Sequence, residues 1–292
     1  MEHTQNTDAF IIGSGPAGCS AALYLCRAGL RVAVAGKDGG ALERAERIEN
    51  YYGLTQPLRG GDLIEIGKKQ CAALGAGMLD DEVISLDWRE DGGYALQLAS
   101  GTAYDAHAVL LATGMAKRAP NIEGIKAFEG KGVSYCAVCD AFLYRGREVA
   151  VLGGGAYARH ELEELLPLAG HVTLLTHGAE PEFDPPGEVE VRTSKILRLR
   201  GGDTLAGAEL ATGQTEAFQG LFVALGSASA GDLARKLGLQ LERGAIPVDG
   251  RQETQLPGLF AAGDCTGAFA QVAFAVAEGA RAGMGMIQYL RH

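Results

Sequence analysis

The amino-acid sequence predicts an α/β protein with two dinucleotide-type domains, because one arrangement of strand, glycine turn, helix and strand occurs twice. In the first copy, an apolar strand at 10–13 leads into the turn Gly13-Ser14-Gly15-Pro16-Ala17-Gly18, a helix to Ala28 and a strand at 31–35. In the second copy, a strand at 148–152 precedes the turn Gly153-Gly154-Gly155-Ala156-Tyr157-Ala158, a helix to about Ala169 and a strand at 172–175. Each copy is followed later by an apolar strand that ends in glycine, at 109–114 and at 221–226.

Both glycine turns are suited to binding phosphate. The first glycine allows a tight bend, the second lets a pyrophosphate approach the backbone, and the third lets helix and strand pack closely. The phosphate then lies at a helix N-terminus, where free N–H groups and the helix dipole favour negative charge. A lone glycine pattern is weak evidence, but a flanking strand and helix make the first turn a strong prediction.

Length and charge narrow the class of protein. With 292 residues, 47% of them hydrophobic, the chain is long enough for two domains with their own cores. A net charge of −10 argues against nucleic acid or an anionic membrane as the main partner. The polar N-terminus shows no signal peptide, and no apolar stretch reaches the ~20 residues of a membrane helix. We therefore expect a cytoplasmic protein.

A cysteine pair lies between the two domains, in the run Cys136-Ala137-Val138-Cys139-Asp140. Two thiols at this spacing form either a redox-active pair or half of a zinc site. Zinc is disfavoured, because the other cysteines form no second CxxC and no cluster with histidine. We therefore predict no metal site and expect buried, structural roles for the remaining cysteines, which are Cys19, Cys26, Cys71 and Cys265.

Further motifs extend the pattern over nearly the whole chain. They are Ile48-Glu49-Asn50-Tyr51-Tyr52-Gly53, Ala112-Thr113-Gly114 and Ala261-Ala262-Gly263-Asp264. Together with the two glycine turns and the cysteine pair, they resemble the low-molecular-weight thioredoxin reductase family. The resemblance implies two Rossmann-like, three-layer domains: an FAD-binding domain made of residues 1–115 and 247–292, and an inserted NAD(P)-type domain at 116–246 that carries the CxxC. It also implies a homodimer.

The resemblance assigns roles to individual residues. The FAD pyrophosphate would be held by Gly13, Ser14, Gly15, Pro16, Ala17 and Gly18, and the rest of the cofactor by Asn50, Thr113, Gly114, Gly263, Asp264 and Gln271. Cys139 would face the flavin, Cys136 would attack the substrate disulfide, and Asp140 would be the acid/base. In the second domain, Gly153, Gly155 and Ala158 would form a second dinucleotide cradle.

The electron donor is the point at which the sequence departs from the family. Members that use NADPH carry a His-Arg-Arg stretch after the second strand of the inserted domain, and its arginines bind the 2′-phosphate. Here that position reads Thr176-His177-Gly178, followed by the acidic stretch 179–184. NADPH is therefore disfavoured, and in this respect the chain resembles members that have lost NADPH recognition and are linked to ferredoxin or flavodoxin or hold a second flavin. The retained glycines of the second turn suit a second FAD or NADH, but the strand end lacks the carboxylate that would bind the ribose of NADH. Ferredoxin, flavodoxin or a second FAD is therefore favoured over NADH.

These motifs predict a flavin-dependent disulfide reductase that acts on thioredoxin or a similar small redox protein. Two alternatives remain open: a dithiol oxidase that passes electrons to oxygen, and a non-enzymatic flavin redox sensor. An acidic ferredoxin would need a basic patch on this acidic protein, and the residues available for one are Arg44, Arg47, Lys68 and Lys69.

Overall fold

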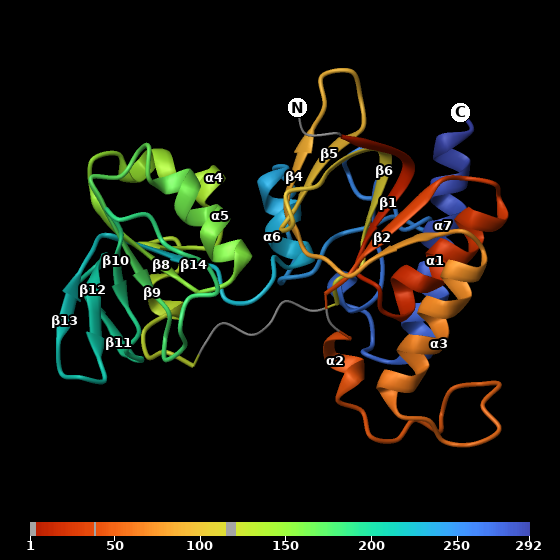
Figure 1. Cartoon of the computed structure of the whole chain (residues 1–292), viewed down its shortest axis with the longest axis horizontal. Coiled ribbons are helices and arrows are strands. Elements are labelled where there is room, and N and C mark those ends of the chain that lie inside the picture. Colours follow the sequence, from red (N-terminus) through yellow and green to blue (C-terminus); the bar gives the residue numbers. More distant parts are fainter. Residues whose placement is uncertain (1–3, 38, 115–120) are drawn as a thin grey trace. The chain divides into compact units, whose positions relative to one another are not determined.

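The computed structural model describes residues 4–37, 39–114 and 121–292, and the chain forms two compact units (Figure 1). The first unit comprises Met1–Ala116 and Ser229–His292, and the second comprises Lys117–Ala228. The sequence places the second boundary later, at residue 247. In the structure, residues 229–246 belong to the first unit because their backbone bonds to it: Ala230 N–H donates to Thr113 Oγ1 (2.8 Å), and Ile246 N–H donates to the Cys265 carbonyl (2.9 Å).

A mainly parallel sheet forms the centre of the first unit. Its described strands run in the order β3-β2-β1-β6-β5-β4, with β15 paired to β6. The four residues of β2 and the last four of β1 are all buried, as expected for parallel strands covered on both faces. The strands are β1 (Gln5–Ile12), β2 (Val32–Ala35), β3 (Gly77–Leu79), β4 (Val83–Trp88), β5 (Tyr94–Leu98), β6 (Ala103–Leu111) and β15 (Leu259–Ala261).

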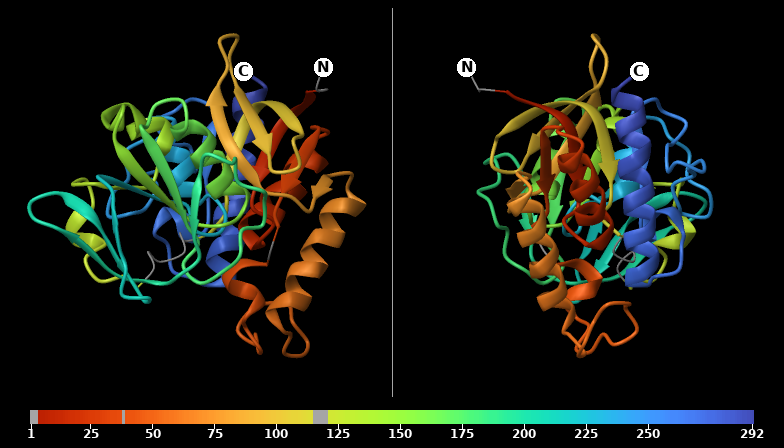
Figure 2. Two further views of the ribbon diagram at one scale, coloured as in Figure 1. Left: turned by 60° about the vertical axis from the view of Figure 1, so that its left-hand side comes forward. Right: turned by 90° about the vertical axis from the view of Figure 1, so that its right-hand side faces the viewer.

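Two helices of the first unit approach each other closely. A Cβ on Gly279 would lie 2.1 Å from Ala17 O, and one on Gly283 would lie 3.0 Å from Ala21 O. These glycines are four residues apart and share one helix face, so α7 packs directly on the backbone of α1 (Figure 2). The helical elements are α1 (Pro16–Arg27), α2 (Gly40–Glu43), α3 (Gly60–Ala73), α6 (Ala230–Lys236), η3 (Asp264–Thr266) and α7 (Val272–Leu290).

The second unit repeats the strand, turn and helix arrangement around a smaller parallel sheet. Its described strands run in the order β10-β9-β8-β14-β7, and β11-β12-β13 form a separate antiparallel sheet. The strands are β7 (Val133–Ser134), β8 (Glu148–Leu152), β9 (His171–Leu175), β10 (Glu190–Arg192), β11 (Ile196–Gly201), β12 (Leu205–Leu210), β13 (Thr215–Ala217) and β14 (Gly220–Val223). The helical elements are η1 (Lys126–Phe128), α4 (Ala137–Asp140), η2 (Ala141–Tyr144) and α5 (Ala156–Leu165).

The duplicated Rossmann-like pattern predicted from the sequence is confirmed, with differences at helix ends. The helix after the second glycine turn ends at Leu165 rather than near Ala169, because the chain already turns there: Gly170 N–H donates to the Arg147 carbonyl (2.8 Å). The last helix begins after Gln271, which takes an extended conformation as its N-cap.

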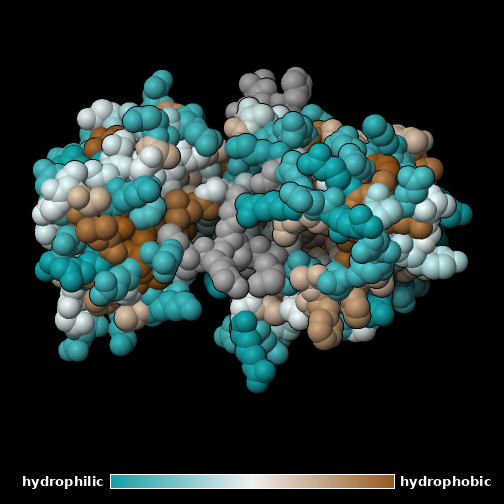
Figure 3. Space-filling model, turned by 90° about the horizontal axis from the view of Figure 1, so that it is seen from below, coloured by the Kyte–Doolittle hydropathy of each residue, from teal (hydrophilic) through white to brown (hydrophobic). Residues whose placement is uncertain are grey.

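The surface drawn in Figure 3 is mostly hydrophilic, with smaller hydrophobic areas between the polar ones. Among the described residues, no helix is both long enough and apolar enough to cross a membrane.

Candidate active site and cofactor cradles

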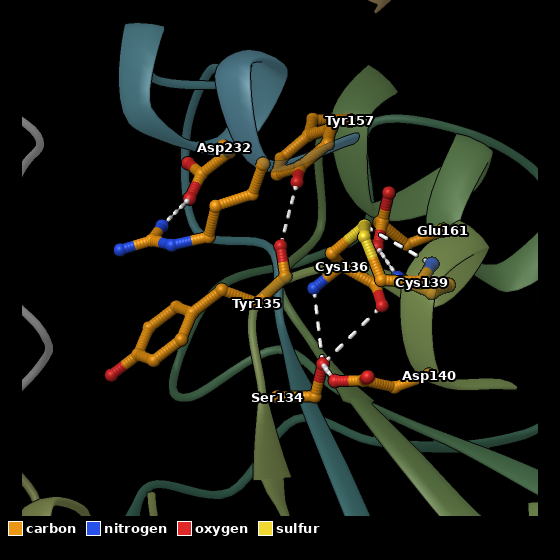
Figure 4. The surroundings of a disulfide bond; sticks show 10 residues. Ser134, Tyr135, Cys136, Cys139, Asp140, Tyr157, Glu161 and Asp232 are labelled. Carbon is orange, nitrogen blue, oxygen red and sulfur yellow. Dashed lines mark hydrogen bonds and ion pairs between the residues drawn. A yellow bond between two sulfur atoms is a disulfide. The ribbon is translucent and has the colours of Figure 1, made fainter. Parts of the chain in front are cut away.

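The two predicted redox cysteines form a disulfide at the start of α4 (Figure 4). Cys136 is the N-cap of this helix, with an extended backbone, and its Sγ accepts the Cys139 N–H at 3.2 Å. Cys136 is 3% exposed, whereas Cys139 is half-buried. The Cys136 sulfur therefore caps α4, and the Cys139 N–H in turn stabilises this sulfur.

Asp140 is held beside the pair by Ser134, a residue to which the sequence assigns no role. The Ser134 hydroxyl donates to Asp140 Oδ2 (2.7 Å) and accepts the Cys136 N–H (3.1 Å). Ser134 is buried at the end of β7, so the sheet fixes both contacts. Asp140 also affects Tyr144, whose pKa is raised first by burial and second by the nearby carboxylate.

A second carboxylate, also missed from the sequence, approaches α4 from helix α5. Glu161 is 1% exposed, and its Oε2 accepts the Ala137 N–H at 2.5 Å. Glu161 lies four residues after Tyr157 and four before Leu165, all on the buried face of α5. A glutamate at a core position of an amphipathic helix is the signal that would have revealed it.

The first glycine turn forms an open cradle. A Cβ on Gly13 would overlap Ala112 O (2.3 Å), and one on Gly18 would overlap Gly13 O (1.9 Å), so both positions require glycine. Gly15, by contrast, has nothing within 4 Å of its Cβ position and no side chain caps α1, which begins with Pro16. The first-turn N–H groups of α1 are therefore available to an anion.

Ser14 adds a polar group to this cradle. Its Oγ is buried and has no hydrogen-bond partner among the described residues. A Cβ on Gly36, at the end of β2, would lie 2.3 Å from that oxygen, so the close approach of the two chains buries it. An uncapped helix N-terminus with an unsatisfied hydroxyl fits the phosphate-rich part of FAD.

The C-terminal motif lies against the same helix. A Cβ on Gly263 would lie 3.1 Å from the Ala17 Cβ, which brings Asp264 next to the first turn of α1. Glu278 of α7 supports this strand end by accepting the Gly263 N–H (2.8 Å) and the Thr266 hydroxyl (2.9 Å). The pKa of the half-buried Asp264 is raised, mainly by burial and further by Glu278. Glu278 has no role in the sequence prediction.

Other predicted cofactor residues also meet in the first unit. Asn50 Nδ2 donates to Gln271 Oε1 (3.0 Å), which joins positions 221 residues apart in the sequence. Thr113 Oγ1 accepts the Ala230 N–H, and Gly114 has a positive φ of 73°. These contacts support a common location for the motifs, while their roles toward FAD stay predictions.

The second glycine turn differs because the chain itself covers it. Gly153 and Ala158 pack tightly, as in the first turn, with the Gly153 Cβ position 2.9 Å from the Ala158 Cβ. Over the turn, however, Glu182 N–H donates to the Gly154 carbonyl (2.7 Å). A Cβ on Gly155 would lie 3.5 Å from Glu182 Oε2, so a carboxylate approaches the N-terminus of α5. The chain segment at 180–182 therefore lies close to this turn, with the exposed Glu182 side chain near Gly155.

His177 does not replace the missing arginines. Its Nδ1 accepts the Ile196 N–H (3.0 Å), and it holds a turn with a positive φ of 53°. Its pKa is lowered by burial and by Lys195, which favours the neutral imidazole. A neutral imidazole whose Nδ1 already accepts a hydrogen bond does not supply the positive charge with which arginines bind a 2′-phosphate.

The remaining cysteines are buried or half-buried and unpaired in disulfides. Burial raises the pKa of the Cys265 thiol to about 12, and Cys19 Sγ donates to the Ser14 carbonyl (3.2 Å). These environments agree with the structural roles expected from the sequence. Among the described residues, no group of three or more His, Cys, Asp or Glu side chains is arranged to hold a metal ion.

Comparison of the sequence with known proteins shows to which family the chain belongs. The model of a family described as pyridine nucleotide-disulphide oxidoreductase matches residues 7–279. The chain belongs to this family. It is 33% identical to a thioredoxin reductase of Helicobacter pylori, over 98% of this chain and 99% of the relative.

Solved structures extend the comparison. An atypical thioredoxin reductase, TRi, from Desulfovibrio vulgaris Hildenborough matches with a TM-score of 0.92 and 40% identity, covering 98% of both chains. A ferredoxin-flavin thioredoxin reductase from Clostridium acetobutylicum matches with a TM-score of 0.75 and 30% identity, covering 99% of both chains. The chain is thus an FAD-dependent, thioredoxin reductase-like disulfide oxidoreductase.

Proposed function

We propose that the chain reduces the disulfide of thioredoxin or a similar small redox protein, with electrons passing from FAD through Cys136 and Cys139. The observation that carries this proposal is the Cys136–Cys139 disulfide at the N-terminus of α4, with Asp140 held at its side by Ser134. The names of the relatives support the choice of substrate.

The chemistry at the pair is thiol–disulfide exchange. FAD, when bound, supplies the two electrons that open the Cys136–Cys139 bond, and each sulfur takes up one proton. Asp140 takes the proton of the Cys136 thiol, and the resulting thiolate attacks one substrate sulfur. A mixed disulfide forms, and the other substrate sulfur leaves as a thiolate that receives the proton from Asp140. The Cys139 thiol then attacks Cys136 Sγ, and its proton goes to the second substrate sulfur as that sulfur leaves, which restores the disulfide.

The first unit would hold FAD. The open turn Gly13 to Gly18, with the free N–H groups of α1 and the Ser14 hydroxyl, would bind the pyrophosphate. The remaining contacts would come from Asn50, Thr113, Gly114, Gly263, Asp264 and Gln271. This assigns the FAD domain to the chain ends and the dithiol to the inserted unit.

The electron donor in this proposal is not NADPH. The Thr176–Gly178 stretch lacks arginine, His177 is neutral and engaged, and the Glu182 carboxylate lies over the second glycine turn. The covered turn also argues against NADH and a second FAD, both of which need the same phosphate position. A small electron-transfer protein, ferredoxin or flavodoxin, is then the preferred donor.

Such a donor would dock on the first unit of a homodimer. Arg44, Arg47 and Lys69 are exposed there, and Lys68 is half-buried. Arg47 already pairs with Glu49 (2.9 Å), which weakens its attraction for an acidic protein. Ferredoxin binding by this patch should therefore be weak at physiological salt.

The substrate proposal is tested with Cys139→Ser, compared with Cys26→Ser, which changes a half-buried cysteine outside the pair. Loss of all thioredoxin disulfide reduction is expected for Cys139→Ser, while Cys26→Ser keeps its activity. Free thiols of thioredoxin are counted after anaerobic turnover. Activity retained without Cys139, or rapid peroxide formation from a small dithiol with no thioredoxin reduction, would contradict the proposal.

The donor is tested on the anaerobic holoenzyme. Flavins released per chain are counted first, and one is expected. NADPH, NADH, reduced ferredoxin and reduced flavodoxin are then added separately while the visible flavin absorbance is followed. Stoichiometric bleaching by one of the two proteins is expected. Rapid bleaching by NADPH, or two flavins per chain, would show that the second cradle opens.

A further inference from the structure

Glu161 is a buried carboxylate that the exchange steps do not use. It is 1% exposed, it belongs to α5, and it reaches across to the Ala137 N–H at 2.5 Å (Figure 4). Burying a carboxylate is costly unless it is hydrogen-bonded. Its position next to the reactive pair therefore calls for a chemical reason.

The geometry brings this carboxylate close to one sulfur. Ala137 follows Cys136 directly, so four covalent bonds hold Cys136 Sγ within about 5 Å of the Ala137 nitrogen. With the 2.5 Å hydrogen bond, Glu161 Oε2 then lies within about 7.5 Å of Cys136 Sγ. A thiolate on Cys136 would face a like charge between two buried side chains.

We propose that Glu161 is a positioning residue of the dithiol centre: it fixes the Ala137 N–H and places a negative charge beside Cys136 that disfavours its thiolate and makes the reduced pair a stronger reductant. This inference rests on the proposed function of the pair as the electron outlet. Asp140, by contrast, is held by a hydroxyl on the β7 side and serves as the proton donor.

The charge of Glu161 also affects the equilibrium between the Cys136–Cys139 disulfide and its reduced dithiol. Reduction of Cys136–Cys139 takes two electrons and two protons, and loss of a proton from a thiol stabilises the reduced form further. A dithiol whose reduced form is stabilised is a strong oxidant. A carboxylate that opposes thiolate formation therefore acts in the other direction and favours passing the electrons on to a substrate disulfide.

Other charged and titratable groups lie on α4 and on the elements that pack against it or against α5. Asp140 lies on α4 and Tyr144 on η2. The groups on α5 are Tyr157, Arg159, His160, Glu163 and Glu164. The strands β8 and β9, which pack on α5, begin with Glu148 and His171. The Tyr157 hydroxyl donates to the Tyr135 carbonyl, and Arg159 pairs with Glu163 at the exposed surface. The Cys139 N–H opposes Glu161 by stabilising the Cys136 sulfur.

The test compares Glu161→Gln with Glu164→Gln, an exposed glutamate one turn further along α5. The glutamine keeps an oxygen for the Ala137 N–H but removes the charge. Two quantities are measured anaerobically on the flavin-loaded protein. One is the alkylation rate of Cys136 by iodoacetamide against pH, with Cys136 and Cys139 resolved by peptide mass spectrometry. The other is the dithiol–disulfide equilibrium against glutathione redox buffers.

In Glu161→Gln, the pKa of the Cys136 thiol is expected to fall by about one to two units, from like charges ~7 Å apart at an effective dielectric constant of ~20. Alkylation at neutral pH should rise several-fold. The equilibrium should shift a few-fold toward the reduced pair at neutral pH and about tenfold above the wild-type pKa of the thiol, where tenfold equals ~30 mV for a two-electron couple. Glu164→Gln should match the wild type in both measurements.

Glu161→Asp provides a second route if the glutamine variant fails to retain flavin. The shorter aspartate side chain keeps the charge but places it farther from Cys136. The pKa of the Cys136 thiol should therefore also fall, but by less than in Glu161→Gln. An unchanged or raised pKa of the Cys136 thiol in a folded variant overturns the inference. Neither measurement needs a donor or thioredoxin. A failure of the proposed substrate would therefore appear separately, as absent thioredoxin reduction in the wild type.

Discussion

The two glycine turns of this chain have the same local design but different surroundings. In both, the first glycine packs against the end of a neighbouring strand, with its Cβ position 2.3 Å from Ala112 O at Gly13 and 2.1 Å from Ala224 O at Gly153. The two turns differ at the second glycine. The Cβ position of Gly15 is open, whereas that of Gly155 lies 3.5 Å from the Glu182 carboxylate. The two glycine motifs therefore share the same helix–strand packing but differ in what lies near their second glycine.

The two glycine turns differ in how well each is prepared to bind the phosphates of a dinucleotide. The first turn keeps the features of an anion site, namely free helix N–H groups and an unsatisfied buried hydroxyl. Near the second turn, the Glu182 carboxylate lies 3.5 Å from the Gly155 Cβ position, although no side chain caps α5. In the proposed function, the first turn binds the flavin and the second serves helix–strand packing.

The largest expected effect comes from placing one methyl group in each cradle. Gly15→Ala should leave the fold intact, because nothing lies within 4 Å of the new Cβ, but the methyl would occupy the space proposed for the FAD pyrophosphate. Overpacking of this kind costs about 1–3 kcal/mol, so FAD affinity should fall roughly 10–100-fold. Equilibrium titration of the flavin-free protein with FAD measures this loss.

Gly155→Ala is the matched control for that experiment. Its Cβ would lie 3.5 Å from Glu182 Oε2, an ordinary contact, so flavin content and FAD affinity should not change. Equal losses of FAD affinity in both variants would break the comparison, because the second turn would then also be a flavin site.

Most of the fold, but only part of the site, could be predicted from the sequence. The turns, their flanking strands and the CxxC are local patterns, so periodicity and spacing reveal them. Glu161 and Glu278 escaped prediction because their roles come from tertiary contacts, to Ala137 on α4 and to Gly263 beyond β15. The acidic stretch 179–184 predicts repulsion of a 2′-phosphate. That this stretch lies against Gly154 depends on the backbone hydrogen bond from Glu182, which no local sequence pattern encodes.

A smaller effect is expected for Glu182→Gln, which removes the charge over the second turn. A carboxylate at a helix N-terminus contributes about 0.3–1 kcal/mol, so the free energy of unfolding should fall by that amount. The loss should shrink at high salt, and Glu188→Gln, an exposed change further along the same segment, should leave stability unchanged. Denaturant titration at two salt concentrations gives both values. A stability gain would mean that Glu182 does not interact favourably with α5.

The smallest effect concerns Asp264, the acid at the open cradle, whose pKa is raised by burial and further by Glu278. Its folded pKa is raised above the ordinary 3.8, so the unfolded chain loses this proton first as pH increases. Folding stability therefore falls with rising pH between 3.8 and the folded pKa, and the loss persists at neutral pH. Asp264→Asn should therefore stabilise the flavin-free protein at pH 7, with no gain below that window. It should also weaken FAD binding if Asp264 contacts the cofactor. Denaturant titrations of both proteins across the acid range measure the first effect, and an Asp264→Asn protein less stable than the wild type at neutral pH would show that this carboxylate, like Glu182, stabilises its own cradle.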